Sequence, residues 1–360
     1  MVNATTKHGA ETSRSFFALY SFFGGLNGKM INIMELRDRY ERVIDYMRIS
    51  ITDRCNLRCV YCMPQKGVRL FEHKEILTYE EIVRIVGIAA CLGVKKIRIT
   101  GGEPLVRKNI LHLISSLKDI NGIEDISLTT NGILLEQYAK GLADSGLDRV
   151  NISLDSLRPD RYREMTRGGD IRPVINGMHA AEEAGLLPVK INVVPIRNLN
   201  NDEIPDFARM TLTTPRHVRF IEFMPIGSRD LWSNERYIST DELKETVAKI
   251  APIMPVRLRK RGPAKYFRFD RAPGVIGFIS ALTHHFCRDC NRLRLTADGK
   301  LRPCLFSETE IDLKPALRKQ LSDKEIERLL RLAIEVKPEG HNIDQRDDLS
   351  SLKNMSRIGG

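Results

Sequence analysis

The chain has no hydrophobic run long enough to span a membrane. The apolar stretch at residues 16–23, FFALYSFF, is interrupted by Ser21 and falls far short of the roughly 20 residues that a membrane-spanning helix needs. No small-residue cleavage pattern follows it, so we expect neither a membrane partner nor a signal peptide. We expect residues 1–33 to be a poorly ordered extension, with Met30 or Met34 as alternative starts.

The chain also lacks the features of common nucleic-acid and nucleotide-binding modules. Its net charge is +11, yet no basic run is interleaved with aromatic residues. The charge therefore favours a small polyanionic ligand, and we expect no nucleic-acid partner. There is no G-x4-G-K-[ST] loop, so a phosphate site has to be built from side chains on separate strands.

Cysteine is scarce and unevenly placed. Six of the seven cysteines fall in two short groups, which is not the framework of a small disulfide-rich secreted domain. Reduced thiols fit a cytoplasmic protein. The seventh, Cys91, lies in a helical pattern and is predicted to be a small core residue.

Three of the cysteines fall in one loop. Residues 51–64 read ITDRCNLRCVYCMP and place Cys55, Cys59 and Cys62 where their thiols can point at one centre. Thiolate is a soft ligand that selects zinc, copper(I) or iron–sulfur clusters, and three local ligands leave one coordination position for another group. A closed zinc site is the alternative, with His73 as the nearest candidate for a fourth ligand.

Strand-like runs alternate with helical patterns through the first part of the chain. The expected strands are residues 47–52, 96–100, 125–129, 149–154, 189–194 and 217–222, and the expected helices are residues 78–93, 108–119, 134–146, 173–185 and 202–211. This alternation predicts an α/β fold with a parallel sheet, either doubly wound or a barrel. Polar or glycine-rich stretches follow the strands, which favours a barrel with its site at the strand carboxyl ends.

A second group of three cysteines follows the alternating region. Cys287 and Cys290 are separated by two residues, and thirteen residues lie between Cys290 and Cys304. Zinc and iron–sulfur sites share such spacings, so a zinc site completed by His284 or His285 stays open. We expect a barrel at residues 34–236, an α+β extension at residues 237–340 and a tail at residues 341–360.

The first triplet resembles the cluster loop of the radical S-adenosylmethionine enzymes. The shared features are the C-x3-C-x2-C spacing, Tyr61 between the last two cysteines, and the later stretch Gly101-Gly102-Glu103-Pro104. The resemblance implies an incomplete (βα)6 TIM-type barrel and a 4Fe-4S cluster whose fourth iron binds S-adenosylmethionine. Matching the motif positions assigns the cluster to Cys55, Cys59 and Cys62, and S-adenosylmethionine to Tyr61, Gly102, Ser153 and Met224.

The second triplet narrows the resemblance to the GTP 3′,8-cyclases, the molybdenum cofactor biosynthesis protein A family. The stretch CRDCNRLRL at residues 287–295, the later Cys304 and the final Gly359-Gly360 match this family, and the similarity covers roughly residues 34–360. It implies that the C-terminal extension carries a second 4Fe-4S cluster, on Cys287, Cys290 and Cys304, whose unique iron meets the guanine of GTP.

The same matching assigns residues to the nucleotide. The residues expected to contact GTP are Arg48, Arg98, Thr129, Lys190, Arg292, Leu293 and Arg294. A triphosphate brings several negative charges, and arginine meets phosphate with paired donors. Arg48 and Arg98 alternate with apolar residues on predicted strands, where a charge needs a partner. Arg292 and Arg294 are also the expected catalytic residues.

The resemblance also implies a reaction. An external electron donor reduces the first cluster, S-adenosylmethionine is cleaved to methionine and a 5′-deoxyadenosyl radical, hydrogen leaves C3′ of GTP, and the C3′ radical attacks C8 of guanine. The expected product is (8S)-3′,8-cyclo-7,8-dihydroguanosine 5′-triphosphate, made in the first step of molybdenum cofactor biosynthesis. A homodimer and a tail that reaches into the pocket are further implications.

Two other functions stay open from the sequence. One is a radical S-adenosylmethionine enzyme that modifies peptides, although the extensions of such enzymes usually hold more cysteines than three. The other is a zinc-dependent nucleic-acid-binding protein that uses the positive charge.

Overall fold

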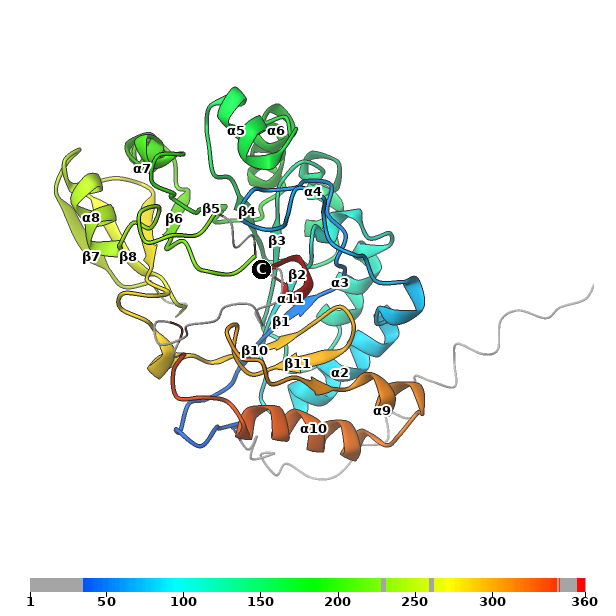
Figure 1. Ribbon diagram of the computed structural model, residues 1–360. Helices are drawn as coiled ribbons and strands as arrows, with labels where there is room; N and C mark the ends of the chain where they lie inside the picture. Colours follow the sequence, from blue (N-terminus) through cyan, green and yellow to red (C-terminus); the bar gives the residue numbers. More distant parts are fainter. Residues whose placement is uncertain (1–34, 228–230, 259–261, 342, 344–354, 360) are drawn as a thin grey trace, which may run out of the picture. The chain divides into compact units, whose positions relative to one another are not determined.

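A twelve-stranded sheet organises the part of the chain that the structure, a computed structural model, describes (Figure 1). The described residues are 35–227, 231–258, 262–341, 343 and 355–359, so the expected extension at residues 1–33 lies outside them. The strands are β1 (Tyr46–Ser50), β2 (Lys96–Thr100), β3 (Asp125–Thr130), β4 (Arg149–Ser153), β5 (Lys190–Val193), β6 (His217–Ile221), β7 (Ile253–Val256), β8 (Lys265–Phe269), β9 (Val275–Ile279), β10 (Arg292–Leu295), β11 (Lys300–Arg302) and β12 (Ile311–Asp312).

The centre of the sheet is parallel, and its order is β12-β11-β10-β1-β2-β3-β4-β5-β6-β9-β8-β7. The six predicted strands, β1 to β6, lie side by side in sequence order. Among the described residues, β12 and β7 each pair with a single strand, so the sheet is not closed. The expected incomplete α/β barrel is therefore confirmed.

The C-terminal part of the chain lengthens this same sheet at both edges. Strand β10 pairs parallel with β1, and β9 pairs parallel with β6. Antiparallel hairpin partners then follow on each side, β11 and β12 beyond β10, and β8 and β7 beyond β9. The barrel expected at residues 34–236 and the extension expected at residues 237–340 thus share one sheet.

Helices lie on the outer face of the sheet (Figure 1). They are α2 (Tyr79–Cys91), α3 (Ile110–Lys118), α4 (Leu135–Asp144), α5 (Pro159–Thr166), α6 (Arg172–Glu183), α7 (Ile204–Thr213), α8 (Thr240–Ala248), α9 (Lys314–Arg318) and α10 (Asp323–Glu335). The short helix α11 (Met355–Ile358) lies instead on the cavity side, where Met355 lines the cavity (Figure 1). The five predicted helices of the alternating region are present, with ends shifted by a few residues. Helix α5 was not predicted, because its short and strongly polar sequence, PDRYREMT, shows no apolar stripe.

Side-chain alternation along the strands separates the core from the barrel interior. In β2, KIRIT, Ile97 and Ile99 are fully buried in the main hydrophobic core, while Arg98 between them lines a cavity inside the barrel. Strands β1 and β10 repeat this pattern with Met47 and Ile49 in the core and the arginines on the other face. The interior of the barrel is thereby lined with charge.

Two further features concern membranes and the seventh cysteine. Within the described residues, no helix combines the length and the apolar character that crossing a bilayer requires. Cys91 is exposed at the end of α2, so the prediction that it is a core residue is wrong. The core face of α2 is filled instead by residues such as Ile82, Ile85 and Val86, and Cys91 faces away from them.

Candidate active site

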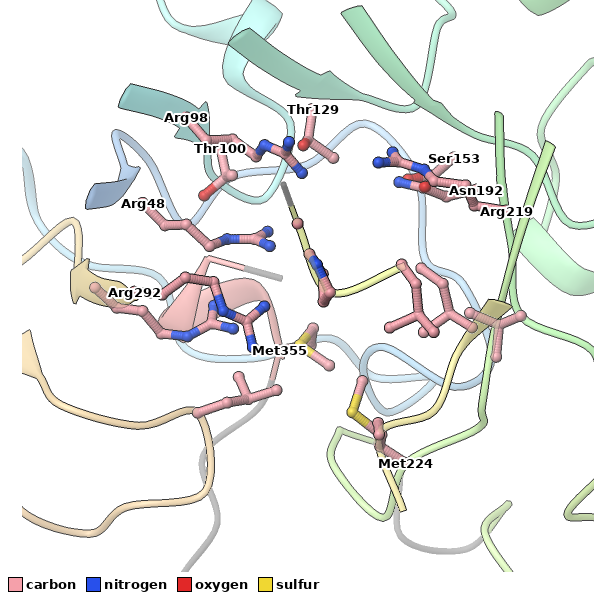
Figure 2. Close-up of a pocket in the computed structure, with 18 of the residues that line it drawn as sticks. Arg48, Arg98, Thr100, Thr129, Ser153, Asn192, Arg219, Met224, Arg292 and Met355 are labelled. Atoms are coloured by element: carbon pink, nitrogen blue, oxygen red, sulfur yellow. The ribbon is translucent and has the colours of Figure 1, made fainter. Parts of the chain in front are cut away.

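One cavity collects the residues that the sequence singles out (Figure 2). Its volume is about 320 Å³, within the range of small-molecule sites, and all six cysteines of the two triplets line it. The other predicted residues that line it are Arg48, Tyr61, Arg98, Gly102, Thr129, Ser153, Lys190, Met224, Arg292 and Arg294. The fold therefore brings together segments that are more than 200 residues apart in the sequence.

Leu293 is the one predicted site residue whose side chain does not reach this cavity. It is fully buried in the hydrophobic core, because successive side chains of a strand point to opposite faces and both of its neighbours, Arg292 and Arg294, face the cavity. The side chain of Leu293 therefore packs in the core, and its predicted contact with GTP would have to come from its backbone atoms.

The first cysteine triplet lies in the loop after β1. This loop is tied to the end of α5, since the Arg58 and Val60 amides donate to the carbonyl oxygens of Thr166 and Met165 at 3.1 and 2.9 Å. Burial raises the pKa of the Cys59 thiol well above its ordinary value, and the neighbouring Cys62 and Asp155 add to the shift. Deprotonation of this thiol therefore calls for a cationic partner such as a metal centre.

The glycines after β2 hold this loop from the other side. The amide of Gly102 donates to the carbonyl oxygen of Thr52 at 2.7 Å, and that of Glu103 donates to the carbonyl oxygen of Arg54 at 2.8 Å. A Cβ at position 102 would overlap the carbonyl oxygen of Arg54. Only glycine lets the two backbones approach this closely, which explains the paired glycines in the sequence.

Glu103 is buried beneath the same loop and organises the end of β3. Its carboxylate accepts hydrogen bonds from the amides of Leu105 and Asn131, at 3.0 and 2.6 Å, and from the hydroxyl of Thr130 at 2.7 Å. Burial raises the pKa of Glu103 to about 7, although these three hydrogen bonds favour the charged form. Asn131 in turn donates to the Cys55 sulfur at 3.9 Å.

Tyr61 is oriented by a carboxylate at the end of β4. Its hydroxyl donates to Asp155 Oδ2 at 2.6 Å, and Asp155 Oδ1 accepts from the amide of Val194 at 2.8 Å. Burial raises the pKa of Asp155 to about 6, against the effect of these two hydrogen bonds. The aromatic ring between Cys59 and Cys62 is thus fixed at the cavity wall.

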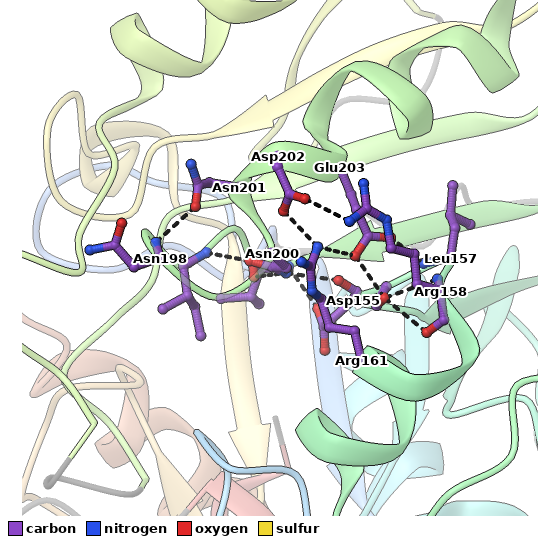
Figure 3. Close-up of polar contacts among 12 residues, drawn as sticks. Asp155, Leu157, Arg158, Arg161, Asn198, Asn200, Asn201, Asp202 and Glu203 are labelled. Carbon is purple, nitrogen blue, oxygen red and sulfur yellow. Dashed lines mark hydrogen bonds and ion pairs between the residues drawn. The ribbon is translucent and has the colours of Figure 1, made fainter.

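A polar network behind Asp155 holds the loops that follow β4 and β5 (Figure 3). Asn200 donates to the carbonyl oxygens of Asp155 and Val194 at 2.7 and 3.0 Å. Glu203, which is fully buried, accepts from the Ser156 hydroxyl and the Leu157 amide at 2.8 and 2.6 Å and pairs with Arg161 at 2.8 Å. These contacts make the cavity wall at Asp155 rigid.

The second triplet lines the same cavity. Cys287 and Cys290 occupy one turn of 3-10 helix, in which the Cys290 amide donates to the carbonyl oxygen of Cys287 at 3.1 Å. Burial opposes ionisation of Cys290, but the nearby charges of Arg292 and Lys337 outweigh it and lower its pKa to about 6. This cysteine is a thiolate at neutral pH and is ready to bind a metal.

Arginines line this cavity, among them Arg48, Arg219 and Arg292 (Figure 2). Burial and the neighbouring Arg294 lower the pKa of Arg48 well below its ordinary value, and burial with Arg292 lowers that of Arg294 to about 9. Burial, followed by the charges of Arg219 and Arg149, lowers the pKa of Lys190 to about 6. This concentration of like charge indicates a site for an anion.

Some polar groups in the cavity wall lack a partner. Among the described residues, Thr129 Oγ1 and Asn192 Oδ1 are buried without a hydrogen-bond partner. Buried polar groups are normally satisfied, so these two atoms are suited to a bound ligand. The Lys190 ammonium has no ion pair or hydrogen bond within the described residues either.

The end of the chain reaches the same place. The carbonyl oxygen of Gly359 accepts hydrogen bonds from Arg48 at 3.4 Å and Arg294 at 3.3 Å. Gly359 has a φ of +72°, and a Cβ there would lie 2.6 Å from Thr100 Oγ1. These contacts place Gly359 against two arginines that line the cavity, whereas Gly360 lies outside the described residues.

The donor geometry argues against a single metal ion. Among the described residues, no three His, Cys, Asp or Glu side chains are placed to hold one ion. Around one zinc ion with bonds of about 2.3 Å, tetrahedral sulfurs stand about 3.8 Å apart. Within the described residues neither triplet forms such a set, which disfavours the zinc sites considered from the sequence.

Sequence reasoning missed several residues of this site. Arg219 on β6 lines the cavity, and its place between Val218 and Phe220 is the same signal that pointed to Arg48 and Arg98. Lys337 and Arg42 support the second triplet, but no local pattern marks them. Lys337 contacts Cys290, which lies 47 residues earlier in the chain, and Arg42 contacts Cys287, which lies 245 residues later.

Two family models match the chain. The radical SAM superfamily matches residues 49–211, and Molybdenum Cofactor Synthesis C matches residues 216–343. Similar proteins include the GTP 3′,8-cyclases of Pelotomaculum thermopropionicum and Thermodesulfovibrio yellowstonii. Each is 51% identical over 327 residues, which cover 90% of this chain and 100% of the relative.

Solved structures agree in fold. Streptococcus suis SuiB bound to S-adenosylmethionine has a TM-score of 0.56 at 16% identity and covers 97% of this chain and 90% of its own. The same enzyme bound to its precursor peptide SuiA has a TM-score of 0.55 at 16% identity and covers 96% and 89%. At this identity the likeness concerns the fold alone.

Proposed function

Because the chain belongs to the GTP 3′,8-cyclase family of radical S-adenosylmethionine enzymes, we propose that its cavity binds S-adenosylmethionine at the first cysteine triplet and GTP at the second. The product is (8S)-3′,8-cyclo-7,8-dihydroguanosine 5′-triphosphate, and the reaction is the first step of molybdenum cofactor biosynthesis. The observation that carries this proposal is that both triplets and the buried basic residues line one cavity.

The residues of the first triplet suit a 4Fe-4S cluster. Cys55, Cys59 and Cys62 are half-buried residues that line the cavity, and among the described residues no set of three donors is placed to hold one ion. When bound, the cluster and S-adenosylmethionine supply a 5′-deoxyadenosyl radical. The protein holds S-adenosylmethionine through Tyr61, Gly102, Ser153 and Met224.

Three of these contacts have a physical basis in the structure. Asp155 fixes the Tyr61 ring, so the ring offers a rigid apolar wall. The lack of a side chain at Gly102 keeps the backbone beside the cysteine loop, where its polar groups can meet the amino acid part of S-adenosylmethionine. Met224, half-buried in a small apolar cluster, offers a polarisable contact for adenine.

The buried cations bind the nucleotide. Arg48, Arg98, Lys190, Arg292 and Arg294 line the cavity, where the negative charges of a triphosphate offset the burial and the neighbouring positive charge that lower the pKa of Arg48, Lys190 and Arg294. The Thr129 hydroxyl, which has no hydrogen-bond partner among the described residues, bonds to the nucleotide. These basic residues thereby favour a polyanion over a neutral ligand.

The second triplet, Cys287, Cys290 and Cys304, holds a second 4Fe-4S cluster with a position open to guanine. The low pKa of Cys290 supports metal binding, and the lack of a three-donor set for one ion among the described residues favours a cluster over zinc. Arg292 and Arg294 project from β10 into the cavity that both triplets line, where they act as the catalytic arginines. The carbonyl oxygen of Gly359 accepts hydrogen bonds from Arg48 on β1 and Arg294 on β10.

Three further parts of the proposal concern the surroundings of the enzyme. An external one-electron donor reduces the first cluster, since no residue type in the chain supplies that electron. A cytoplasmic location keeps the six cluster thiols reduced. A homodimer is proposed from the family resemblance.

The test is to reconstitute the full chain anaerobically with iron and sulfide and incubate it with GTP, S-adenosylmethionine and a reductant. Mass spectrometry then follows the cyclised nucleotide and 5′-deoxyadenosine. The Cys55→Ala variant should form neither compound, and Cys287→Ala should form no cyclised nucleotide. Unchanged 5′-deoxyadenosine from Cys55→Ala would refute the assignment of the first triplet. The SuiB likeness extends to the fold alone, so nothing favours peptide modification as a second candidate.

A further inference from the structure

Lys337 lies two residues beyond the end of α10 and is buried directly behind the second triplet. Only 2% of its surface is exposed. Its ammonium group donates to the Cys290 sulfur at 3.7 Å and to the carbonyl oxygens of Arg292 and Pro303 at 2.9 and 2.7 Å. An ammonium group has three donors, so all three are used.

These three bonds join the two arms of the triplet. Arg292 follows Cys290 by two residues, and Pro303 directly precedes Cys304. One lysine therefore holds Arg292, which follows the first two cysteines, and Pro303, which directly precedes the third. Its position relative to both arms does not depend on any bound group.

The ammonium is also placed for its charge. Within the described residues, Lys337 has no carboxylate partner at ion-pair distance, and the groups of opposite charge that act on it are the sulfurs of Cys290 and Cys304. A buried cation without a carboxylate is costly unless an anion compensates it. Thiolates that bind a cluster are that anion.

A second cation holds the segment that carries Lys337. Arg42, paired with the buried Asp38 at 2.6 Å, donates to the carbonyl oxygens of Cys287 at 2.7 Å, Pro338 at 2.6 Å and Glu339 at 2.8 Å. The residues after Lys337 are thereby locked against the first cysteine of the triplet. Arg42 bonds to carbonyl oxygens, whereas Lys337 bonds to a cluster sulfur as well.

We propose that Lys337 is a positioning residue of the second cluster that holds both arms of the triplet and raises the reduction potential of the cluster through its charge and its N–H···S hydrogen bond. This inference rests on the proposed second cluster. A reduced cluster carries one more negative charge than an oxidised one, so a fixed cation at the sulfur stabilises the reduced form more. One electron enters from an external reductant, and no bond forms or breaks.

The experiment uses the full chain with Cys55, Cys59 and Cys62 all changed to Ala, so that only the second triplet can hold iron. Lys337→Met removes the charge and the donors at similar length. Lys337→Gln removes the charge but keeps a donor. Lys324→Met makes the same chemical change at an exposed position of α10 and serves as the control. Each protein is reconstituted anaerobically, its iron, sulfide and melting temperature are measured, and the cluster is titrated with redox dyes followed by electron paramagnetic resonance.

We expect Lys337→Met to lower the equilibrium constant for reduction at least about tenfold, a shift of about 59 mV to more negative potential for one electron. Lys337→Gln should shift in the same direction by less, and Lys324→Met should not shift. Loss of iron from both Lys337 variants at unchanged melting temperature would also support the positioning role. A potential equal to that of Lys324→Met would overturn the inference and leave the proposed function intact. Failure of the parent protein to hold a 4Fe-4S cluster would overturn the second cluster itself.

Discussion

Arg294 on β10 donates a hydrogen bond to the carbonyl oxygen of Gly359, 3.3 Å away and 65 residues later in the chain. Arg48 on the neighbouring strand donates to the same oxygen at 3.4 Å. The two arginines proposed to meet GTP therefore share one backbone acceptor from the tail. The tail sets the direction of both guanidinium groups while it neutralises part of their charge.

Gly359→Ala tests this relationship. The alanine Cβ would lie 2.6 Å from Thr100 Oγ1, and the φ of +72° disfavours any side chain, so the tail should leave its site. We expect formation of the cyclised nucleotide to fall by about 100-fold, because misplacement of about 1 Å near reacting groups has an effect of this size. Formation of 5′-deoxyadenosine should persist, since the first triplet does not contact Gly359.

Gly185→Ala is the matched control for that variant. Gly185 also has a positive φ, +77°, but no atom lies within 4 Å of the added Cβ. It should lose about 1–2 kcal/mol of stability and keep its cyclisation activity. Equal losses of activity in the two glycine variants would show that the effect comes from backbone strain and not from the tail.

Lys190 should couple nucleotide binding to proton uptake. Its pKa is lowered to about 6 by burial and by the charges of Arg219 and Arg149, so it is mostly neutral in the free protein at pH 7.5. The phosphates of GTP favour the charged form and raise this pKa, so a proton is taken up on binding at pH values between the free and bound pKa. Calorimetry in two buffers of different ionisation enthalpy measures this uptake.

Lys190→Met should abolish the uptake and weaken GTP binding about 10- to 100-fold, as expected for loss of a charged hydrogen bond of about 1.5–3 kcal/mol. Lys265→Met, at an exposed position of β8, should change neither quantity. The free protein should also become more stable as the pH rises from about 6 towards 10.5, because the unfolded lysine binds its proton up to the ordinary value. Proton uptake that is unchanged in Lys190→Met would assign the titration to another group.

Most of the barrel was predictable because its signals are local. The cysteine spacings, the six strand-like runs and the charged residues among apolar neighbours on β1 and β2 can be read within windows of a few residues. The strands β9 and β10 could not be assigned to the barrel edges, because pairing with β6 and β1 joins segments that are far apart in sequence. Propensity alone does not state which edge a strand joins.

The supporting residues of the site were harder to predict than the residues that line it. Arg42, Glu203 and Lys337 are ordinary polar residues in sequence, and each becomes buried only where two or more loops meet. Leu293 shows the limit of motif matching. The match to the family assigned it to GTP, whereas strand geometry places its side chain in the core.

Glu203→Gln should destabilise the fold strongly. The carboxylate is fully buried and accepts from Ser156, Leu157 and Arg161, so the amide group of glutamine would face at least one of these donors. Breaking one partner of a buried ion pair costs about 3–5 kcal/mol. Urea denaturation of the full chain measures this loss.

Asp202→Asn is the control for that change. Asp202 is adjacent in sequence, pairs with the same Arg161 at 2.6 Å, and is 46% exposed. An exposed pair contributes about 0–1 kcal/mol, so this variant should stay close to the parent protein. Similar stabilities for the two variants would mean that the network behind Asp155 does not stabilise the cavity wall.

The most direct test of the whole account uses GTP deuterated at C3′. If the two triplets bring S-adenosylmethionine and GTP together in one cavity, the deuterium should appear in 5′-deoxyadenosine, and the cyclised nucleotide should form in the same incubation. Mass spectrometry of both compounds reports the transfer. Two results would contradict the account. One is cyclised nucleotide that forms while 5′-deoxyadenosine gains no deuterium, and the other is 5′-deoxyadenosine that forms with no cyclised nucleotide.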